Sequence, residues 1–407
     1  MAASAGRVTA SAAAAPGSLK IAVVTGGIPH YRWAFFSELA ERGATVRLIA
    51  AGKLPPGIIA TRPPDARITL TELPSGRPRW RSDVVAELQR FAPDVILLEH
   101  GSALDYTWTT LLARRVKAPR ILWTHGIARQ ELYGGKRGPA SWGRWTQLRL
   151  ANAIVCYDAQ MAERMARRYP RKVVGSAPNS TDGRAIVAER ERCEREGQAV
   201  VRRELGLSAR FYLAGLGRLV AEKDFARLLR VGAALRSGGL DVGVILVGGG
   251  PEEGALRREA ETLGMIVGRD VHFTGGVSDP AALARWLFAA DACVSPGPLG
   301  LSVVDCLFAG IPVISCEPQV DGPHHGPEWR CLRPGVTGYF ASSNTDDALA
   351  RACAEYLVRG DEAHHEVRRA CTKEADERLG IAKMADGMLS VVAAVLDGSA
   401  RSLTVRR

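Results

Sequence analysis

FYLAGLGRLVAEK, residues 211–223, is the stretch that decides the fold of this 407-residue chain. Its first six residues form an apolar run, and the next seven place Arg218 and Lys223 directly after it. An apolar run of this length that ends at a glycine predicts a buried strand followed by a turn. The guanidinium of Arg218 offers a planar fork for phosphate oxygens and Lys223 a mobile point charge, so both can converge on one pyrophosphate. Two exposed basic residues in a loop are the alternative interpretation.

Apolar runs of the same kind recur along the whole chain and alternate with helical patterns. Strands that are apolar throughout and separated by helices indicate parallel sheets covered on both faces. A helix is predicted over residues 224–236, with Asp224 as its N-cap. The fold class is therefore α/β, with two doubly wound, Rossmann-like domains. The expected strands are residues 20–25, 45–50, 94–99, 120–124, 153–157, 172–175, 211–216, 242–247, 271–274, 292–295 and 312–315.

The length of the chain is too great for one ordinary core and fits two domains. A charged helical segment, residues 186–205, interrupts the alternation and marks the junction. We predict a disordered Ala- and Ser-rich tail over residues 1–18, with a cleaved leader as the alternative. An N-terminal domain over 19–190 and a C-terminal domain over 200–380 follow. An apolar helix over 381–400 is expected to cross back to the first domain.

The net charge of +11 is concentrated in one segment, because residues 114–172 hold fourteen Lys and Arg against three acids. Nucleic acid, an anionic membrane surface or an acidic substrate would each suit such a patch, and a merely solvated basic face is the bland alternative. Tryptophans interleaved with cations favour lipid headgroups. We therefore assign acceptor or membrane contact to Lys136, Arg137, Trp142, Arg144 and Trp145.

Composition also bears on the compartment. No run approaches the roughly 20 apolar residues that span a bilayer. None of the eight cysteines forms a CxxC pair, which favours reduced thiols over disulfides or a zinc site. The protein is expected to be cytoplasmic, with peripheral attachment to the inner face of the plasma membrane.

Two further glycine-containing runs follow predicted strands. In SPGPLGLSVVDCLFAG, residues 295–310, a loop leads into a helix whose first N–H groups would favour an anion. Asp305 lies one turn into that helix, where it could accept hydrogen bonds from ribose hydroxyls or could be an ordinary polar residue. Gly26 and Gly27 end the first strand and permit close backbone approach to a phosphate or sugar. The dinucleotide fingerprint GxGxxG is absent.

These motifs, taken in order, resemble glycosyltransferase family 4. The second half carries GRLVAEK, then VILVGGGPE (residues 244–252), VHFTGGVSD (271–279) and the glycine-containing loop with its helix. The first half carries GGIPHYRWAFFSELAERG (26–43), ILWTHG (121–126), ANAIVCYDAQ (151–160) and APNSTD (177–182). The resemblance covers the chain from Leu19 onward. It implies the GT-B fold, in which two Rossmann-like domains face each other across a cleft.

The resemblance also implies roles for individual residues. Arg218 and Lys223 would contact the donor diphosphate, where fixed cations stabilise the charge that develops on the leaving group. His125, which ends ILWTHG, would contact the donor sugar near the reacting carbon, whereas a lone histidine is otherwise a structural residue. The implied catalytic residues are thus His125, Arg218 and Lys223. The implied donor-binding residues are Gly26, Gly27, Arg218, Lys223, Gly249, Val277, Gly300, Leu301 and Asp305.

The chain departs from the family pattern at one position. The family carries two glutamates separated by seven residues, and here those positions are Gly297 and Asp305. Gly297 supplies no carboxylate near the donor sugar, which indicates either altered sugar recognition or a weakened enzyme. We prefer altered recognition, because His125, Arg218 and Lys223 are present. No DxD motif occurs, so a metal-independent mechanism is expected, with no metal site and no cofactor besides the nucleotide-sugar substrate.

The predicted function is a retaining, hexosyltransferase-type glycosyltransferase that uses a UDP- or GDP-sugar. Its acceptor would be a hydroxyl, on a molecule linked to a polyprenyl diphosphate, in polysaccharide or glycoconjugate assembly. An epimerase or hydrolase on the same fold and a non-catalytic donor-binding descendant are the alternatives. Nucleic acid is not expected as a partner, because no recognised motif accompanies the basic segment. The donor base, sugar, acceptor, linkage and oligomeric state are not specified by the sequence.

Overall fold

The computed structural model describes residues 19–52, 65–73, 79–101, 105–127, 138–319 and 322–398. These divide into two compact units. The first contains the described residues up to Gly126, Gly138–Ala177 and those from Ala385 onward, and the second contains Ile127 and Pro178–Met384. The predicted tail over 1–18 and the predicted contact residues Lys136 and Arg137 lie outside the described residues.

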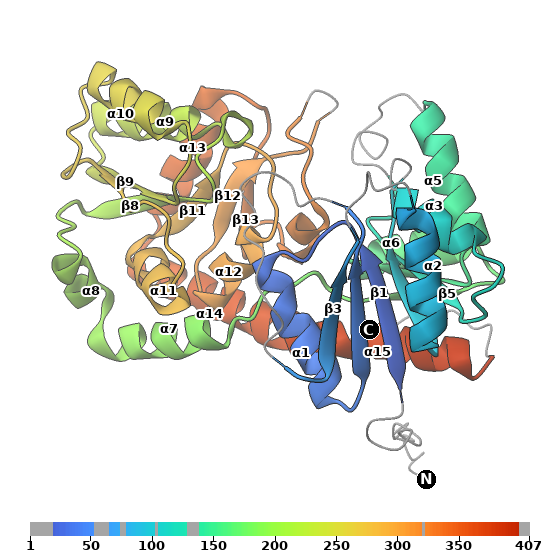
Figure 1. Cartoon of the computed structure of the whole chain (residues 1–407). Helices are drawn as coiled ribbons and strands as arrows, with labels where there is room; N and C mark the ends of the chain where they lie inside the picture. Colours follow the sequence, from blue (N-terminus) through green and yellow to red (C-terminus); the bar gives the residue numbers. More distant parts are fainter. Residues whose placement is uncertain are drawn as a thin grey trace, which may run out of the picture. The chain divides into compact units, whose positions relative to one another are not determined.

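The first unit is built on a parallel sheet in the order β3-β2-β1-β4-β5-β6-β7 (Figure 1). Its central strands are buried on both faces, as the apolar runs predict, with Ile21, Ile96, Leu97 and Ile121 fully buried. Reversal of the strand order beside β1 is the doubly wound arrangement. The strands are β1 (Lys20–Thr25), β2 (Thr45–Ala50), β3 (Ile68–Glu72), β4 (Val95–Glu99), β5 (Arg120–Thr124), β6 (Ala153–Cys156) and β7 (Val173–Ser176).

Helices connect these strands and pack on the sheet. They are η1 (His30–Arg32), α1 (Trp33–Glu41), α2 (Trp80–Phe91), α3 (Asp105–Leu112), α5 (Pro139–Leu150) and α6 (Ala159–Arg168). Asp158 caps α6, because its carboxylate accepts the N–H of Met161 at 2.8 Å.

Helix α15 (Ile381–Leu396) joins the two units through the chain, since its first residues belong to the second unit and those from Ala385 to the first. In the first unit it packs closely on the end of β7. A Cβ added to Gly387 would lie 2.2 Å from the carbonyl oxygen of Ser176. The stretch Asp361–Leu396 is long and apolar enough to pass a composition test for a membrane span, but 44% of its apolar window is buried. Met384, Met388 and Val391 are almost fully buried, so α15 serves as a core helix.

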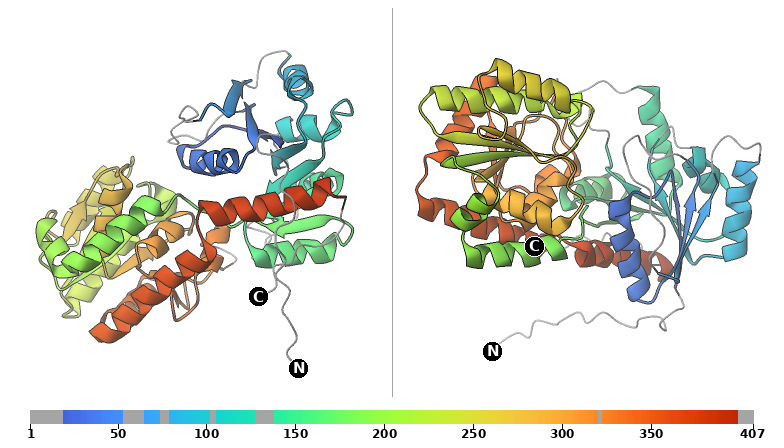
Figure 2. Two further views of the ribbon diagram at one scale, coloured as in Figure 1. Left: turned by 90° about the horizontal axis from the view of Figure 1, so that it is seen from below. Right: turned by 60° about the vertical axis from the view of Figure 1, so that its left-hand side comes forward.

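The second unit repeats the architecture with the strand order β10-β9-β8-β11-β12-β13, again all parallel. Figure 1 shows α9, α10 and α13 above this sheet and α11 and α12 below it, and Figure 2 gives two further views. The strands are β8 (Phe211–Leu216), β9 (Val242–Val247), β10 (Val271–Phe273), β11 (Ala292–Ser295), β12 (Val313–Cys316) and β13 (Gly338–Ala341). The helices are α7 (Arg184–Glu196), α8 (Gln198–Glu204), η2 (Ala221–Lys223), α9 (Phe225–Ser237), α10 (Glu253–Thr262), α11 (Pro280–Ala289), α12 (Ser302–Phe308), η3 (Pro327–Cys331), α13 (Asp346–Leu357) and α14 (Asp361–Arg378).

The division between the units falls at residues 177 and 178, earlier than the predicted boundary at 190. Helix α7 belongs to the second unit because it packs on α11. Arg285 of α11 forms ion pairs of 3.1 Å with both Glu189 and Glu196 of α7. Cys193 is buried in the core of the same unit. The segment predicted to be helical is helical, and its charged appearance reflects ion pairs across a helix interface inside the second unit.

Two further details differ from the sequence prediction. Asp224 occupies the N-cap position of α9, but its side chain makes no capping bond and forms a 3.1 Å ion pair with Arg227. Strands β3 and β13 were not predicted. Each lies at one edge of its sheet and lacks a continuous apolar run, because β3 alternates apolar with polar residues and β13 begins at a glycine. All eight cysteines are free, and seven of them are buried.

Candidate functional site

The loop after β8, residues 217–223, meets the loop after β9 at the carboxyl edge of the second sheet. Gly248 has φ of +143°, and a Cβ there would lie 1.9 Å from the carbonyl oxygen of Gly217. The N–H of Leu219 donates to the carbonyl of Gly249 at 3.0 Å. Glycine is thus required at 248 for the two loops to touch, and the contact fixes the backbone that carries Arg218. The side chain of Arg218 is exposed at this edge.

The loop after β11, residues 296–301, packs against the other end of the same segment. The Nζ of Lys223 donates to the carbonyl of Pro298 at 2.7 Å. A Cβ added to Gly297 would lie 2.4 Å from the carbonyl oxygen of Glu222 and 2.9 Å from the Cα of Lys223. Real Cβ atoms do not approach backbone so closely. No side chain fits at position 297 in this conformation, which gives a packing reason for the departure from the family pattern.

A buried histidine supports the 296–301 loop from behind. The Nδ1 of His325 accepts the N–H of Leu299 at 3.1 Å, and its Nε2 lies 3.0 Å from the carbonyl of Cys316. These partners assign the proton to Nε2, which leaves the ring neutral with both nitrogens satisfied. His325 is 2% exposed. It anchors the loop to the end of β12, and the sequence prediction did not single it out.

Backbone N–H groups at the start of α12 are available to a ligand. Within the described part of the chain, the N–H groups of Gly300 and Leu301 have no acceptor. Gly249 lies close to the next loop, since a Cβ there would be 3.2 Å from the N of Gly276. Val277 follows and packs half-buried against the core. The structure therefore brings together the predicted donor-binding residues of the second unit along one edge of its sheet.

Asp305 lies on α12 at this edge and is held by a residue that the sequence prediction missed. The hydroxyl of Thr181 donates to its Oδ1 at 2.7 Å. Burial raises the pKa of Asp305 to about 6, although the hydrogen bond from Thr181 opposes the shift. A carboxylate in this state gains from further donors, and a pair of vicinal hydroxyls would supply them.

A second buried pair connects the same segment to η3. The side-chain amide of Asn179 donates to the carboxylate of Glu328, and both residues are almost fully buried. The Oδ1 of Asn179 is buried without a partner among the described residues. Neither pairing could be derived from the sequence, because Asn179 and Glu328 are 149 positions apart.

In the first unit, Gly26 and Gly27 follow β1 as predicted. The N–H of Gly26 donates to Oε2 of Glu99 at 3.1 Å, and the hydroxyl of Tyr106 donates to the same oxygen. Burial and the adjacent carboxylate of Glu99 raise the pKa of Tyr106. A Cβ on Gly52 would lie 2.8 Å from the Cα of Gly26, so the backbone here is closely packed. Glu99 fixes the turn at which the two glycines lie.

His125 follows β5 and lies beside aromatic side chains. Its ring centroid is 4.7 Å from that of Tyr157. The guanidinium of Arg32 lies 4.5 Å from the ring centroid of Trp123 and 3.5 Å from the hydroxyl of Tyr157. Arg32, which the sequence prediction did not assign, is thus held over the aromatic wall next to His125.

A half-buried histidine positions the turn that carries His125. The Nδ1 of His100 lies 2.5 Å from the hydroxyl of Thr124, and its Nε2 lies 3.0 Å from the carbonyl of Arg144. The N–H of Gly126 donates to the same hydroxyl at 2.7 Å. Burial lowers the pKa of His100 to about 4, so the ring is neutral at physiological pH. Gly126 has φ of +76°, which favours glycine at this turn.

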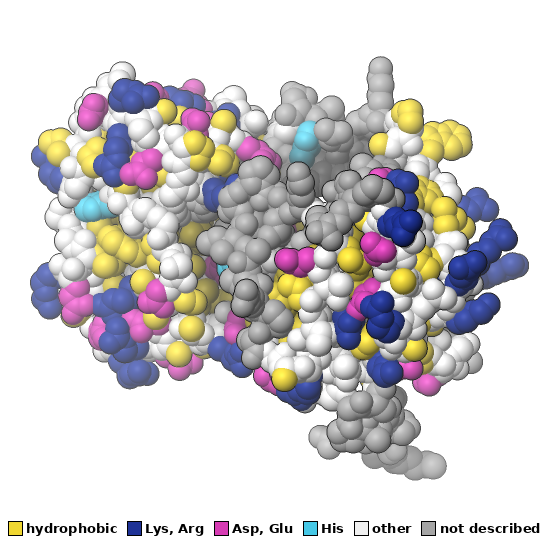
Figure 3. All heavy atoms as spheres, viewed as in Figure 1, with side chains coloured by type: hydrophobic (Ala, Val, Ile, Leu, Met, Phe, Trp, Pro, Cys, Tyr) yellow, Lys and Arg dark blue, Asp and Glu magenta, His cyan; other side chains and the backbone are white. Residues whose placement is uncertain are grey.

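The basic segment, residues 114–172, is described at 114–127 and from Gly138 onward, and the predicted contact residues of its second part differ in exposure. Trp142 on α5 is 76% exposed. Trp145 is only partly exposed, with the guanidinium of Arg168 4.7 Å above its ring. The carbonyl of Arg144 holds His100. Figure 3 shows Lys and Arg side chains gathered at the right-hand edge of the first unit. Trp142 remains a candidate contact residue, whereas Trp145 is partly covered by Arg168.

Two further features bear on ligands. The described residues contain no group of His, Cys, Asp or Glu that could hold a metal ion.

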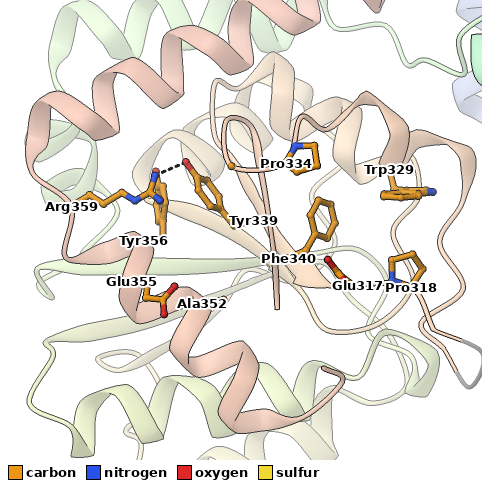
Figure 4. A pocket seen from close by; sticks show the side chains of 11 residues that line it. Glu317, Pro318, Trp329, Pro334, Tyr339, Phe340, Ala352, Glu355, Tyr356 and Arg359 are labelled. Carbon is orange, nitrogen blue, oxygen red and sulfur yellow. Dashed lines mark hydrogen bonds between the residues drawn. The ribbon is translucent and has the colours of Figure 1, made fainter. Parts of the chain in front are cut away.

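A cavity of about 570 Å³ opens in the second unit beside β13, lined by Trp329, Phe340, Tyr339 and Arg359 among others (Figure 4). It lies away from the loops at residues 217–223 and 296–301, whose residues do not line it.

Two doubly wound units with this arrangement of strand-end loops have the GT-B fold of glycosyltransferases. The structure is similar to that of Anabaena HepE in complex with UDP and glucose, with a TM-score of 0.64 and 16% identity over 92% of this chain and 100% of that chain. It is also similar to sucrose-phosphate synthase from Thermosynechococcus elongatus, with a TM-score of 0.69 and 17% identity over 94% of this chain and 100% of that chain.

Sequence comparison identifies the family. Residues 25–182 match the description Glycosyltransferase Family 4, and residues 210–358 match Glycosyl transferases group 1. Together these matches cover well over half of the chain, and the chain belongs to glycosyltransferase family 4. It is 29% identical over 211 residues to the GDP-mannose-dependent α-(1-6)-phosphatidylinositol dimannoside mannosyltransferase of Mycobacterium tuberculosis. That match spans 51% of this chain and 49% of the relative, so about half the length of the curated relative is matched.

Proposed function

We propose that this protein is a retaining glycosyltransferase that moves a sugar from a UDP- or GDP-sugar to a hydroxyl acceptor without a metal ion. The observation that carries the proposal is the junction of two strand-end loops in the second unit. The bond from Lys223 to Pro298 and the close approach of Gly297 hold a cation-bearing segment against a loop with available N–H groups. Cations and N–H groups at one sheet edge suit a diphosphate.

The proposed chemistry divides between these residues and Asp305. The bond between the anomeric carbon and the donor phosphate oxygen breaks, and the acceptor oxygen forms a new bond to that carbon on the same face. The acceptor proton passes to the departing diphosphate. Arg218 and Lys223 would stabilise the charge that accumulates on the diphosphate. Asp305 would accept hydrogen bonds from the ribose, and His125 would contact the donor sugar.

The relatives support the class of donor. HepE was solved with UDP and glucose, and the mycobacterial relative is GDP-mannose-dependent. GDP-mannose is a nucleotide-sugar, and UDP is the product that a UDP-sugar leaves after transfer. Both ligands carry a diphosphate, which agrees with the proposed diphosphate site. They differ in the base, so both UDP and GDP donors belong to the proposal.

A thermal-shift screen against UDP, GDP, TDP and ADP and their sugar conjugates tests the donor site. We expect one base to raise the Tm, and Arg218→Ala and Lys223→Ala to abolish that rise. Arg351→Ala is the matched control, because it removes an exposed arginine from α13, outside the proposed site. No rise with any nucleotide would contradict the proposal, whereas tight donor binding with no turnover over a broad acceptor panel would favour a non-catalytic donor-binding descendant. Turnover of the donor without an acceptor would instead indicate an epimerase or hydrolase.

For the acceptor, we propose a lipid-linked hydroxyl that the enzyme reaches at the cytoplasmic face of the plasma membrane. The exposed Trp142 supports this, together with Leu150, which is 45% exposed on the same helix. Exposed Arg149 on α5 and Arg167 and Arg171 on and after α6 add positive charge to the same unit. Apolar side chains among cations suit an anionic headgroup surface.

Vesicle sedimentation tests the membrane part separately. The protein should bind phosphatidylglycerol vesicles, and Trp142→Ala combined with Arg149→Ala should release it, while Arg351→Ala should not. Binding that is unchanged in the double variant would refute the membrane proposal and leave the donor proposal intact.

A further inference from the structure

A second cavity of about 660 Å³ lies in the second unit at the amino ends of β8, β9 and β11. The residues that line it include Arg210 and Phe211 at the start of β8, Asp291 before β11, and Gly360 at the start of α14. The proposed donor loops follow the carboxyl ends of the same strands. Since β8 has six residues, the two sites are separated by about 20 Å along the strand.

Cationic side chains dominate the lining. Four arginines face two aspartates, and two histidines add further nitrogen atoms. Asp291 is already committed, because its carboxylate accepts the N–H of Tyr212 at 2.7 Å and pairs with Arg202 at 2.7 Å. Asp291 also lies close enough to Arg368 to favour its charged form, and Asp361, at the exposed start of α14, is the second carboxylate of the lining. Two carboxylates thus face four guanidinium groups. The cavity is therefore electropositive.

Some of the polar and basic side chains that line the cavity cap the C-terminus of α11. The last carbonyls of a helix lack intrahelical partners. Here the side-chain amide of Gln198 donates to the carbonyl of Phe288 at 3.0 Å, and Nε of Arg202 donates to that of Ala289 at 2.8 Å. Nη2 of Arg368 donates to the carbonyl of Ala290 at 2.6 Å. These bonds explain why Gln198, Arg202 and Arg368 lie where they do.

Some of the other donors that line the cavity have no acceptor among the described residues. Nη1 of Arg368 is buried without an acceptor there, and burial lowers the pKa of this guanidinium. A buried cationic N–H without a partner is costly, and an anion would relieve it. The guanidinium of Arg210 lies over the ring of Phe211 at 5.0 Å and makes no ion pair within the described ranges. His365 is exposed at the same cavity.

Aromatic side chains lie beside the remaining residues of the cavity wall. His364 stacks on Tyr356 with ring centroids 4.9 Å apart and planes at 26°. Arg359 donates to the hydroxyl of Tyr339 at 2.8 Å, the bond drawn in Figure 4, and also lines this cavity. Arg359 is thus held in place by its hydrogen bond, which lowers the entropy that this side chain loses when a ligand is bound.

We propose that this cavity binds a small multivalent anion of the phosphate class, such as pyrophosphate or a compact phosphate ester. Arg210, His365 and the free edge of Arg368 would be its direct ligands. The planar guanidinium of arginine matches phosphate oxygens in geometry and charge. A divalent or trivalent anion also balances the surplus positive charge of the cavity, which a ligand with a single carboxylate would not do. The inference does not rest on the proposed function, because it concerns the opposite edge of the sheet.

Calorimetric titration of pyrophosphate into the full chain tests the proposal. The Arg218→Ala, Lys223→Ala double variant is the background, since it removes the cations of the proposed donor site. We expect binding to persist in this background and to weaken about tenfold on adding Arg210→Ala, as loss of one charged hydrogen bond predicts. Arg203→Ala is the matched control, because it removes an exposed arginine from α8 that does not line the cavity.

The outcomes separate clearly. Loss of affinity in Arg210→Ala and His365→Ala, with none in Arg203→Ala, would support the site, and circular dichroism would verify the fold of each variant. Parallel titrations with glucose 1-phosphate would distinguish a phosphate ester from an inorganic anion as the preferred ligand. No binding in the double-variant background, or equal weakening by Arg203→Ala, would overturn the proposal.

Discussion

Replacement of Asp305 by asparagine is expected to stabilise the protein at neutral pH while it impairs the proposed donor site. Burial raises the pKa of Asp305 from its ordinary value of 3.8 to about 6. Each pKa unit corresponds to about 1.4 kcal/mol, so the ionised side chain costs the folded state about 3 kcal/mol. Asparagine keeps an oxygen that can accept the hydroxyl of Thr181 and carries no charge to desolvate.

The sign of the pH dependence follows from the direction of the shift. Because the folded-state pKa of Asp305 is raised, folding takes up a proton between the two pKa values. The stability that this group contributes is full below about pH 4 and is lost as the pH rises through about 6. Asp305→Asn removes this loss. Its stabilising effect should therefore be large at about pH 7.5 and should vanish at about pH 4.

Thermal denaturation at the two pH values measures the effect. A gain of about 1 kcal/mol moves the Tm of a domain of this size by about 2–4 °C, so a rise of several degrees is expected at neutral pH. Asp376→Asn, the same change at an exposed position of α14, is the control and should have little effect at either pH. An equal rise at both pH values, or a lower Tm at neutral pH, would refute the reasoning. The variant should also lose the nucleotide-dependent Tm rise, if the ribose assignment is correct.

Three other substitutions test the packing of the two sites by thermal or chemical denaturation. Gly297→Ala should cost about 1–3 kcal/mol, because its Cβ meets the Glu222 carbonyl, whereas Gly300→Ala in the same loop meets nothing within 4 Å and should be neutral; equal stability of the two variants would contradict the contact. His325→Ala should cost about 2–4 kcal/mol through two lost hydrogen bonds and a cavity, and a smaller loss would mean that the loop is held by other contacts. Gly126→Ala should destabilise the first unit by more than about 1 kcal/mol, since φ is +76° and its Cβ would lie 2.5 Å from the side chain of Met161; an unchanged Tm would show that the turn can relax.

The sequence predicted the parts of the fold that depend on local pattern. Continuous apolar runs located the central strands of both sheets, and the glycines after β1 and β8 located the turns at their carboxyl ends. Two of the four edge strands, β3 and β13, escaped the prediction, because β3 alternates apolar with polar residues and β13 begins at a glycine, whereas the apolar runs of β7 and β10 were recognised. The charged helix α7 was placed at the junction and not inside the second unit, since charged residues look alike in sequence whether they face solvent or pair across a helix interface.

The residues of the candidate site show the same contrast between what local sequence predicts and what only the structure shows. Residues within a local motif, such as Arg218, Lys223 and His125, could be named from the chain. The residues that hold them could not, because their partners are distant in sequence. Thr181 reaches Asp305 across 124 positions, and His100 reaches the carbonyl of Arg144 across 44. Such supports are specified by tertiary packing, which one sequence does not display.

Gly297 can be interpreted both from the local sequence pattern and from the tertiary packing. Compared with the family pattern, position 297 lacks a carboxylate, and that absence alone suggests a weakened enzyme. In the structure, the same glycine lets its loop approach the backbone of Glu222 and Lys223, and the ammonium of Lys223 reaches the carbonyl of Pro298 only because of that approach. A glutamate at 297 would have to displace the loop and with it the lysine. The missing carboxylate and the position of the cation are thus two consequences of one backbone contact. The packing of the loop on the backbone of Glu222 and Lys223 therefore accounts for glycine at position 297 without any need to invoke decay of the site.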